Sequence, residues 1–157
     1  MLENVNRGEV TMNAEQMWDE YKKINKNIGD EYQSWSFGID ADLLAELVVK
    51  GEKTATSSAY PLYEVENEDL PTVGKYDVIL NSKDEAICII QTTKVYVVPF
   101  DEVSAEHALK EGEGDKTIDF WREGHREFFT MCMNEVGKEF NEDMKVVCEE
   151  FAVVFKG

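Results

Sequence analysis

The sequence predicts a single α+β domain, in which a mixed sheet or small β-barrel carries flanking helices. The expected elements run in the order helices, strands, helices, strand, without the regular strand–helix alternation of a doubly wound sheet. An apolar stretch from Ala86 to Val98, rich in Ile, Val and Thr, is long enough to curl around a small barrel. The 157 residues, 43% of them hydrophobic, suffice for one substantial core.

Two helices are expected in the first third of the chain. The first begins at the capping-box pair Asn13 and Gln16 and continues to about Ile28. The second has Asp40 as its N-cap and ends at Gly51, because glycine tolerates the positive φ of a helix C-terminus. The residues before the first helix show no hydrophobic periodicity. We therefore expect residues 1–12 to be a flexible tail and residues 13–157 to be the domain.

The rest of the chain is expected to supply connectors, a hairpin, two more helices and a last strand. Trp35 and Phe37 are interpreted as packing anchors in a short connector, and residues 64–69 as an acidic loop. Asp115 is the predicted N-cap of the longest helix. The expected elements are a hairpin of strands 76–81 and 86–98, helices 105–110 and 116–136, and strand 144–155.

The net charge of -17 restricts the class of partner. Tight, sequence-independent binding to long nucleic acid requires a basic surface, so we expect such binding to be weak or absent. A small basic pocket is compatible with this charge. No apolar run is long enough to cross a bilayer, and the N-terminus lacks a secretory core. The sequence therefore predicts a cytoplasmic protein with no membrane partner.

The cysteines and histidines do not form a metal-binding pattern. Cys88, Cys132 and Cys148 are widely spaced and include no CxxC pair, and neither His107 nor His125 completes a ligand spacing with them. We interpret the cysteines as reduced and structural, and we expect no metal or other cofactor. His107 is expected at the surface, and His125 is expected to be a packed or supporting residue.

The stretch from Lys50 to Ser58 combines a helix stop, an amine and several hydroxyls. On an extended strand, Thr54 and Thr56 share one face, and the other face carries Lys53, Ala55 and Ser57. Two interpretations are open. The stretch is either a helix cap followed by a polar edge strand, or part of a functional site.

Glu111 is a candidate partner for Lys53. It lies at the end of a predicted short helix, where the helix dipole disfavours a carboxylate, so a cation is expected nearby. A protonated Lys53 would orient a substrate oxygen or phosphate. A neutral Lys53, with the proton on Glu111, would attack an amide or activate water. Glu113 and Asp115 are interpreted as acids of a solvated loop.

Several of these segments resemble the ASCH domain. Residues 51–57, 71–74 and 97–103 are similar to its motifs, and residues 108–115, with Trp121-Arg122 and His125, are similar to its larger bacterial branch. The resemblance covers about residues 31–155. It implies a small PUA-like β-barrel with flanking helices and a cleft for RNA or a nucleotide beside Lys53.

The resemblance also implies roles for individual residues. Smaller members remove acetyl from acetylated cytidine with a lysine, a threonine three positions later and a glutamate, which here are Lys53, Thr56 and Glu111. Those hydrolases carry an arginine where Ser58 stands. The expected ligand-binding residues are Ser57, Ser58, Trp121, Arg122 and His125.

Three functional hypotheses follow. The first is a hydrolase acting on a small acylated nucleoside, with Lys53 as base or nucleophile, Thr56 as a positioning hydroxyl and Glu111 as acid/base partner. The second is a non-catalytic binder of a nucleotide or short RNA in the same cleft. The third is a protein-interaction module. The sequence does not identify the oligomeric state.

Overall fold

The computed structural model describes residues 11–157. Of the predicted tail, only Thr11 and Met12 belong to this part, and the Met12 carbonyl accepts a hydrogen bond of 2.8 Å from the Ala86 N–H. Among the described residues, no helix is both long enough and apolar enough to span a membrane.

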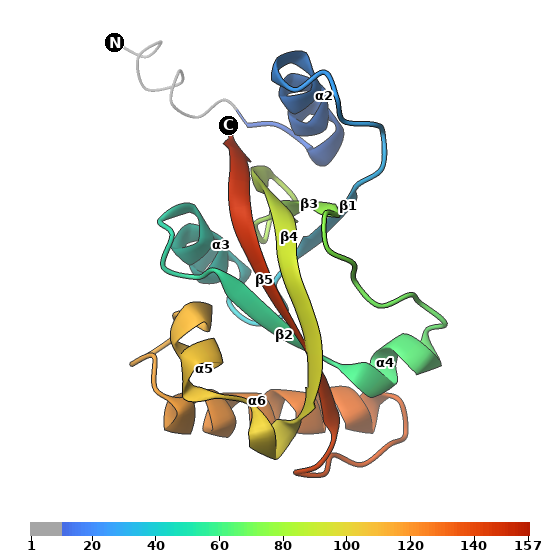
Figure 1. The fold of residues 1–157 in the computed structure, drawn as a ribbon, viewed down its shortest axis with the longest axis vertical. Coiled ribbons are helices and arrows are strands. Elements are labelled where there is room, and N and C mark those ends of the chain that lie inside the picture. Colours follow the sequence, from blue (N-terminus) through green and yellow to red (C-terminus); the bar gives the residue numbers. More distant parts are fainter. Residues whose placement is uncertain (1–10) are drawn as a thin grey trace.

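Residues 11–157 contain one five-stranded mixed sheet in the order β1-β3-β4-β5-β2. β1 pairs with β3 in parallel, and every other pair is antiparallel. The strands are β1 (Gln33–Ser36), β2 (Ala55–Ala59), β3 (Tyr76–Leu80), β4 (Ala86–Pro99) and β5 (Lys145–Lys156). β4 and β5 run side by side along the length of the molecule (Figure 1). The predicted α+β fold, a mixed sheet with flanking helices, is confirmed, and the predicted small barrel is a half-barrel.

The long strands bend, and the sheet stays open. The β4–β5 register shifts between Ile89 and Ile90 and again between Thr92 and Lys94. Such irregularities increase the local twist and let a long strand curl. β1 and β2 are the two edges of the curled sheet, so the half-barrel has an open side between them.

The helices cover both faces and one end of the sheet. α2 lies at one end of the molecule, and α5 and α6 lie at the other, with α3 and α4 on opposite sides (Figure 1). The helices are α2 (Ala14–Ile24), α3 (Ala41–Val49), α4 (Tyr60–Val65), α5 (Ala105–Glu111) and α6 (Ile118–Glu135). A 3-10 turn, Phe100–Glu102, leads from β4 towards α5.

Alternation along β3 and β4 explains how helices pack on both faces. Val78 and Ile89 face α2, whereas their neighbours Ile79 and Ile90 face α3. The first half of β5, with Val146 and Cys148, packs on α6, where Phe129 is fully buried. Burial of apolar area on both faces is the main stabilising contribution of this arrangement.

Several predicted boundaries are wrong in detail. α2 ends at Ile24, which is 70% exposed, because the chain turns back so that the Trp18 indole donates to the Gly29 carbonyl. Trp35 lies in strand β1 and not in a connector, since it pairs with Ile79 of β3. The N-cap of α6 is Thr117, and Asp115 instead accepts hydrogen bonds from Thr117. The segment at Pro61 is the short helix α4.

Candidate functional site

The turn after α3 places Lys53 inside the protein. Gly51 has a φ of 79°, and the N–H groups of Glu52 and Lys53 both bond to the Leu47 carbonyl. This turn directs the Lys53 side chain inward just before β2. The side chain is 0% exposed, which is rare for a lysine unless it is paired.

The end of α5 is held against this turn. The Thr54 N–H donates to the Lys110 carbonyl at 2.7 Å. Gly112, with a φ of 69°, ends the helix, and a Cβ there would lie 2.0 Å from the Glu52 carbonyl oxygen. The contact requires glycine for both its backbone angle and its size. Glu111, the last residue of α5, is therefore fixed beside Lys53.

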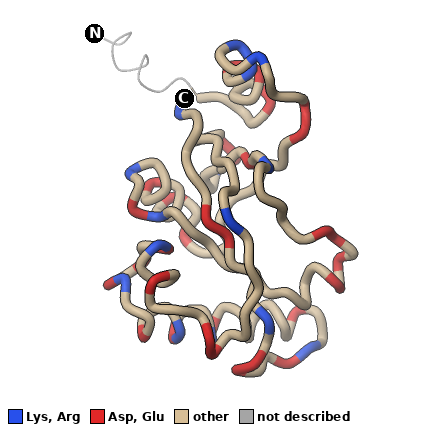
Figure 2. Tube along the Cα trace, in the orientation of Figure 1, with Lys and Arg blue, Asp and Glu red and all other residues tan. Residues whose placement is uncertain are grey.

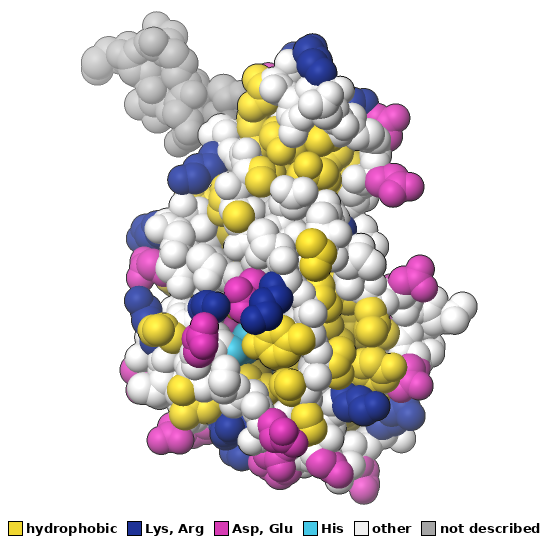
Figure 3. Space-filling view, in the orientation of Figure 1, with side chains coloured by type: hydrophobic (Ala, Val, Ile, Leu, Met, Phe, Trp, Pro, Cys, Tyr) yellow, Lys and Arg dark blue, Asp and Glu magenta, His cyan; other side chains and the backbone are white. Residues whose placement is uncertain are grey.

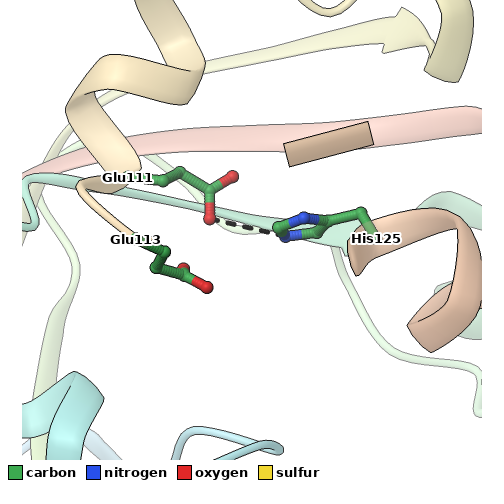
Figure 4. Close-up of side chains that lie close together, drawn as sticks. All are labelled: Glu111, Glu113 and His125. Carbon is green, nitrogen blue, oxygen red and sulfur yellow. Dashed lines mark ion pairs between the residues drawn. The ribbon is translucent and has the colours of Figure 1, made fainter. Parts of the chain in front are cut away.

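Lys53 lies between two carboxylates. Its Nζ is 3.2 Å from Glu111 Oε1 and 2.7 Å from Glu113 Oε2. The Glu111 and Glu113 side chains both extend from the end of α5 and the loop after it (Figure 4). Glu113 was predicted to be a solvated loop acid, and this is wrong, because its carboxylate covers the ammonium. The Phe37 ring lies on another side of Lys53, with its centroid 5.3 Å from Nζ.

The Glu111 carboxylate is held by neutral donors as well. The Ser57 hydroxyl donates to Oε2 at 2.8 Å and the Trp121 indole donates at 2.6 Å. His107 Nε2 lies 2.7 Å from the same oxygen. The expectation that His107 is a surface residue is wrong, since it is 1% exposed. It sits four residues before Glu111 on α5, so the two side chains meet on one helix face.

His125 has one ring nitrogen fixed and the other directed at Glu111. Its Nδ1 lies 2.9 Å from the Trp121 carbonyl, which only accepts, so Nδ1 carries a proton. Its ring stacks on Trp121 with centroids 4.2 Å apart. Nε2 faces Glu111 Oε1 at 3.6 Å, as the dashed line in Figure 4 marks. Nε2 is therefore the nitrogen that can exchange a proton with a ligand.

Lys53, His107, Glu111, Glu113 and His125 form one cluster of side chains, called here the Lys53 cluster. Its electrostatics stabilise the charged forms of Glu111 and His125. Burial alone would raise the pKa of Glu111, but the Lys53 charge, the His107 hydrogen bond and the nearby His125 hold it well below its usual range. Burial likewise opposes charging of His125, but the carboxylates of Glu111 and Glu113 raise its pKa above the ordinary value. Glu111 is therefore a carboxylate at neutral pH, and the raised pKa makes the His125 imidazole a stronger base than a free one.

A metal ion does not fit this cluster. Ligand atoms of Glu111, Glu113 and His125 lie within 4.8 Å of one another, a spacing that a cation could bridge. However, the Lys53 ammonium already pairs with both carboxylates. A divalent cation bound there would meet this buried positive charge, so Lys53 takes the place of a metal.

The cluster opens onto a large cleft along the open side of the half-barrel. The cleft has a volume of about 1920 Å³ and is lined by both edge strands, β1 and β2, as well as by α6. Lys53, Ser57, Glu111 and His125 belong to this lining.

Comparison with known proteins assigns the family. The sequence model of the ASCH domain matches residues 33–155. The chain belongs to the ASCH domain family. The ASCH domain of Lactobacillus crispatus JV V101 is 34% identical, with a TM-score of 0.83 over 90% of this chain and 93% of that chain. A protein of Enterococcus faecalis V583 is 35% identical, with a TM-score of 0.84 over 92% of this chain and 94% of that chain. Comparison with curated proteins finds no match.

Not every predicted site residue of this ASCH domain joins the cluster. Thr56 lines the cleft but lies opposite Glu149 on β5, and it is Ser57 that contacts Glu111. Ser58 lines the cleft too, and its hydroxyl lies 2.8 Å from the Tyr63 hydroxyl. Arg122 donates to the carbonyls of Phe100 and Val103 and thereby holds the β4–α5 connection. It does not line the cleft.

A second polar group, which the sequence did not predict, places Lys75 and Glu149 in the cleft lining of the ASCH domain, with Asp77 buried beside Lys75. Asp77 is 1% exposed and accepts hydrogen bonds from the Trp35 indole, at 3.0 Å, and from Lys75. Lys75 also faces Glu149, at 3.7 Å. The available signal was a charged residue, Asp77 or Glu149, at an inward position of an otherwise apolar strand.

Proposed function

We propose that this ASCH domain is a hydrolase that removes the acyl group from a small N-acylated nucleoside. The observation that supports this most directly is the buried Lys53–Glu111 pair in the lining of an open cleft. A buried ion pair contributes little net stability compared with apolar packing, so its presence beside a cleft favours a functional role. The proposal uses the cluster as it stands, with charged Lys53 and Glu111.

Lys53 acts as the oxyanion-stabilising donor in this proposal. Between two carboxylates, its amine is held as an ammonium, which is a poor base or nucleophile. When a ligand displaces the partly exposed Glu113 carboxylate, the acyl oxygen takes its place on the ammonium. A preorganised cation at that point stabilises the negative charge that develops when the carbonyl is attacked. Thr56, on the same cleft, supplies a positioning hydroxyl.

His125 moves the proton. Its Nε2 takes a proton from water as the water oxygen bonds to the acyl carbon. The carbon–nitrogen bond of the amide then breaks, and the same proton passes from Nε2 to the leaving nitrogen. The products are a carboxylic acid and the free amine of the base. Glu111, beside Nε2, stabilises the intermediate imidazolium.

The charge distribution favours a small ligand over long RNA. Acidic residues are spread over most helices and loops of the described chain, and Lys and Arg are interspersed among them (Figure 2). On the face shown in Figure 3, the basic side chains are scattered and form no continuous stripe. With few phosphates neutralised, affinity for a long polyanion stays low.

The alternative is a nucleotide or short-RNA binder without catalysis. It is favoured by the number of donors that hold Glu111, since a carboxylate fixed in this way serves as well for orientation as for proton transfer. The two functions differ in whether the ligand is altered.

Turnover distinguishes them. The purified protein is incubated with N4-acetylcytidine and other N-acylated nucleosides, and release of the free nucleoside is followed by chromatography. We expect hydrolysis, with kcat lowered by about 10²-fold or more in His125→Gln, as for loss of a general acid–base. Arg126→Gln, one residue further on α6 and paired with Glu142 at the surface, is the matched control. Absence of turnover for every substrate contradicts the proposal and favours the binder.

A further inference from the structure

The cleft contains a second lysine held between two carboxylates, and the proposed reaction does not use it. Lys75 pairs with Asp77 and faces Glu149, as Lys53 pairs with Glu111 and Glu113. The Lys75 side chain is 22% exposed, and the Glu149 side chain is 11% exposed. Both residues line the cleft.

An aromatic strip joins the two lysine centres. The Phe37 ring lies 5.3 Å from the Lys53 ammonium, and the Trp35 ring lies 4.9 Å from Phe37, edge to face. The Trp35 indole then donates to Asp77 at 3.0 Å. Both rings line the cleft. A ligand spanning this strip would have a flat, apolar middle with polar groups at both ends.

Glu149 is the less tightly held carboxylate of the second centre. Lys75 Nζ is 3.7 Å from Glu149 Oε1, which is longer than a direct hydrogen bond. Burial raises the pKa of Glu149, and the Asp77 charge adds to this effect, whereas Lys75 and a hydrogen bond from Thr92 oppose it. A buried carboxylate in this state gains from a ligand hydroxyl or amine that donates to it. Its formal charge, two carboxylates against one ammonium, disfavours a phosphate.

We propose that Lys75 and Glu149, with Asp77 as the buried partner of Lys75, form a subsite that binds the sugar hydroxyls of an unphosphorylated nucleoside, while its base lies towards Lys53. This rests on the proposed function and deepens it, because it assigns residues outside the Lys53 cluster to recognition of the sugar and disfavours a nucleotide. The ribose hydroxyls donate to Glu149, and Lys75 donates to a sugar oxygen.

Equilibrium binding tests the subsite without requiring turnover. Calorimetric titration compares cytidine, cytosine and cytidine 5′-monophosphate on the wild-type protein. We expect cytidine to bind about tenfold more tightly than cytosine, the effect of one charge-assisted hydrogen bond, and more tightly than the monophosphate. Equal affinity for cytidine and cytosine, tighter binding of the monophosphate, or no binding of cytidine at millimolar concentration overturns the subsite.

Variants separate recognition from structure. Glu149→Gln is expected to remove the preference for cytidine over cytosine and leave cytosine binding unchanged. Glu150→Gln is the matched control, because it is the next residue of β5 and pairs with Lys110 outside the cleft. An equal loss of affinity for both compounds in Glu149→Gln means a structural role and contradicts the subsite. If the cytidine preference is present but N4-acetylcytidine is not hydrolysed, the subsite stands and the hydrolase proposal fails.

Discussion

The Lys53 ammonium and the Glu111 carboxylate lie 3.2 Å apart although 58 residues separate them, and their side chains are 0% and 1% exposed. Two local features bring them together. The turn at Gly51 directs Lys53 inward, and Gly112 lets the end of α5 approach the backbone at Glu52. The pair therefore depends on backbone conformation at two glycines as much as on charge.

The hydrogen bond from Trp121 to Glu111 gives the first prediction. Trp121→Phe keeps one aromatic ring but removes the indole N–H and part of the indole volume, so the buried carboxylate loses its 2.6 Å donor. We expect the lost hydrogen bond to a charged group to lower the free energy of unfolding by about 1.5–3 kcal/mol, in addition to a cavity cost that the control shares. Trp18→Phe is the control, since its indole donates to a neutral carbonyl and its loss should cost about 0.5–1.5 kcal/mol. Urea denaturation measures both, and an equal loss in the two variants contradicts the prediction.

The second prediction concerns the close contact between Gly112 and the Glu52 carbonyl. Gly51→Ala and Gly112→Ala both force alanine into positive φ, which costs about 1–2 kcal/mol. Only at Gly112 would the new Cβ meet a backbone oxygen, whereas at Gly51 it meets nothing within 4 Å. We expect Gly112→Ala to be clearly the more destabilising in thermal denaturation. It should also abolish turnover of N4-acetylcytidine, because Glu111 and Glu113 move. Equal effects of the two substitutions would show that the α5 end adapts.

The charge state of His125 gives the third. Because Glu111 and Glu113 raise its pKa against the effect of burial, NMR titration should give a value above the ordinary 6.5. A raised folded pKa contributes stability that is fully present below the unfolded pKa and is lost as pH rises through the folded pKa. Glu111→Gln removes one of the two carboxylates and should lower the His125 pKa. A midpoint at or below the ordinary value in the wild-type protein contradicts this.

The acid side of the stability profile gives the fourth. The folded pKa of Glu111 lies well below its ordinary value, since Lys53 and the histidines outweigh burial. Glu111 therefore contributes stability that is present above the unfolded pKa of about 4.3 and lost as pH falls through the folded value. Glu111→Gln should lose less stability on acidification than the wild-type protein. Glu106→Gln, an exposed acid on the same helix whose pKa Lys110 lowers, should change the slope much less, because an exposed pair contributes little stability.

The sequence predicted the main elements because their signals are local. The capping box at Asn13, the turn glycine at Gly51 and the hairpin of β3 and β4 each depend on neighbouring residues. The Lys53–Glu111 pairing was also expected, because a carboxylate at a helix end needs a cation. His107 could have been found from its position four residues before Glu111.

The second centre could not be predicted in this way. Its assembly depends on β1 pairing in parallel with β3 and on β2 lying opposite Glu149, and both contacts are long-range. β1 has only four residues, which are too few for an alternating hydrophobic pattern to identify a strand in the sequence. Trp35 therefore seemed to be a packing anchor, whereas in the structure it also donates to Asp77.

The last prediction concerns the energy of the Lys53–Glu111 pair. Because both side chains are buried, Lys53→Met leaves the Glu111 and Glu113 charges without their cation and should cost about 3–5 kcal/mol. An exposed pair would cost under ~1 kcal/mol. Lys50→Met, which breaks an exposed helix pair with Glu46, should change stability little and is the control.

A double-mutant cycle then separates a buried charge from lost packing. Adding Glu111→Gln to Lys53→Met removes the orphaned carboxylate while its amide keeps an acceptor for Trp121 and Ser57. We expect the double variant to be more stable than Lys53→Met alone, since neighbouring charges are not additive. Chemical denaturation at neutral pH gives all four free energies. If Lys53→Met proves as mild as Lys50→Met, the ammonium is solvated in solution and the buried geometry is wrong. If the free-energy changes of the two substitutions are additive, the cost comes from lost packing of the lysine side chain, and the pair has no electrostatic role in stability.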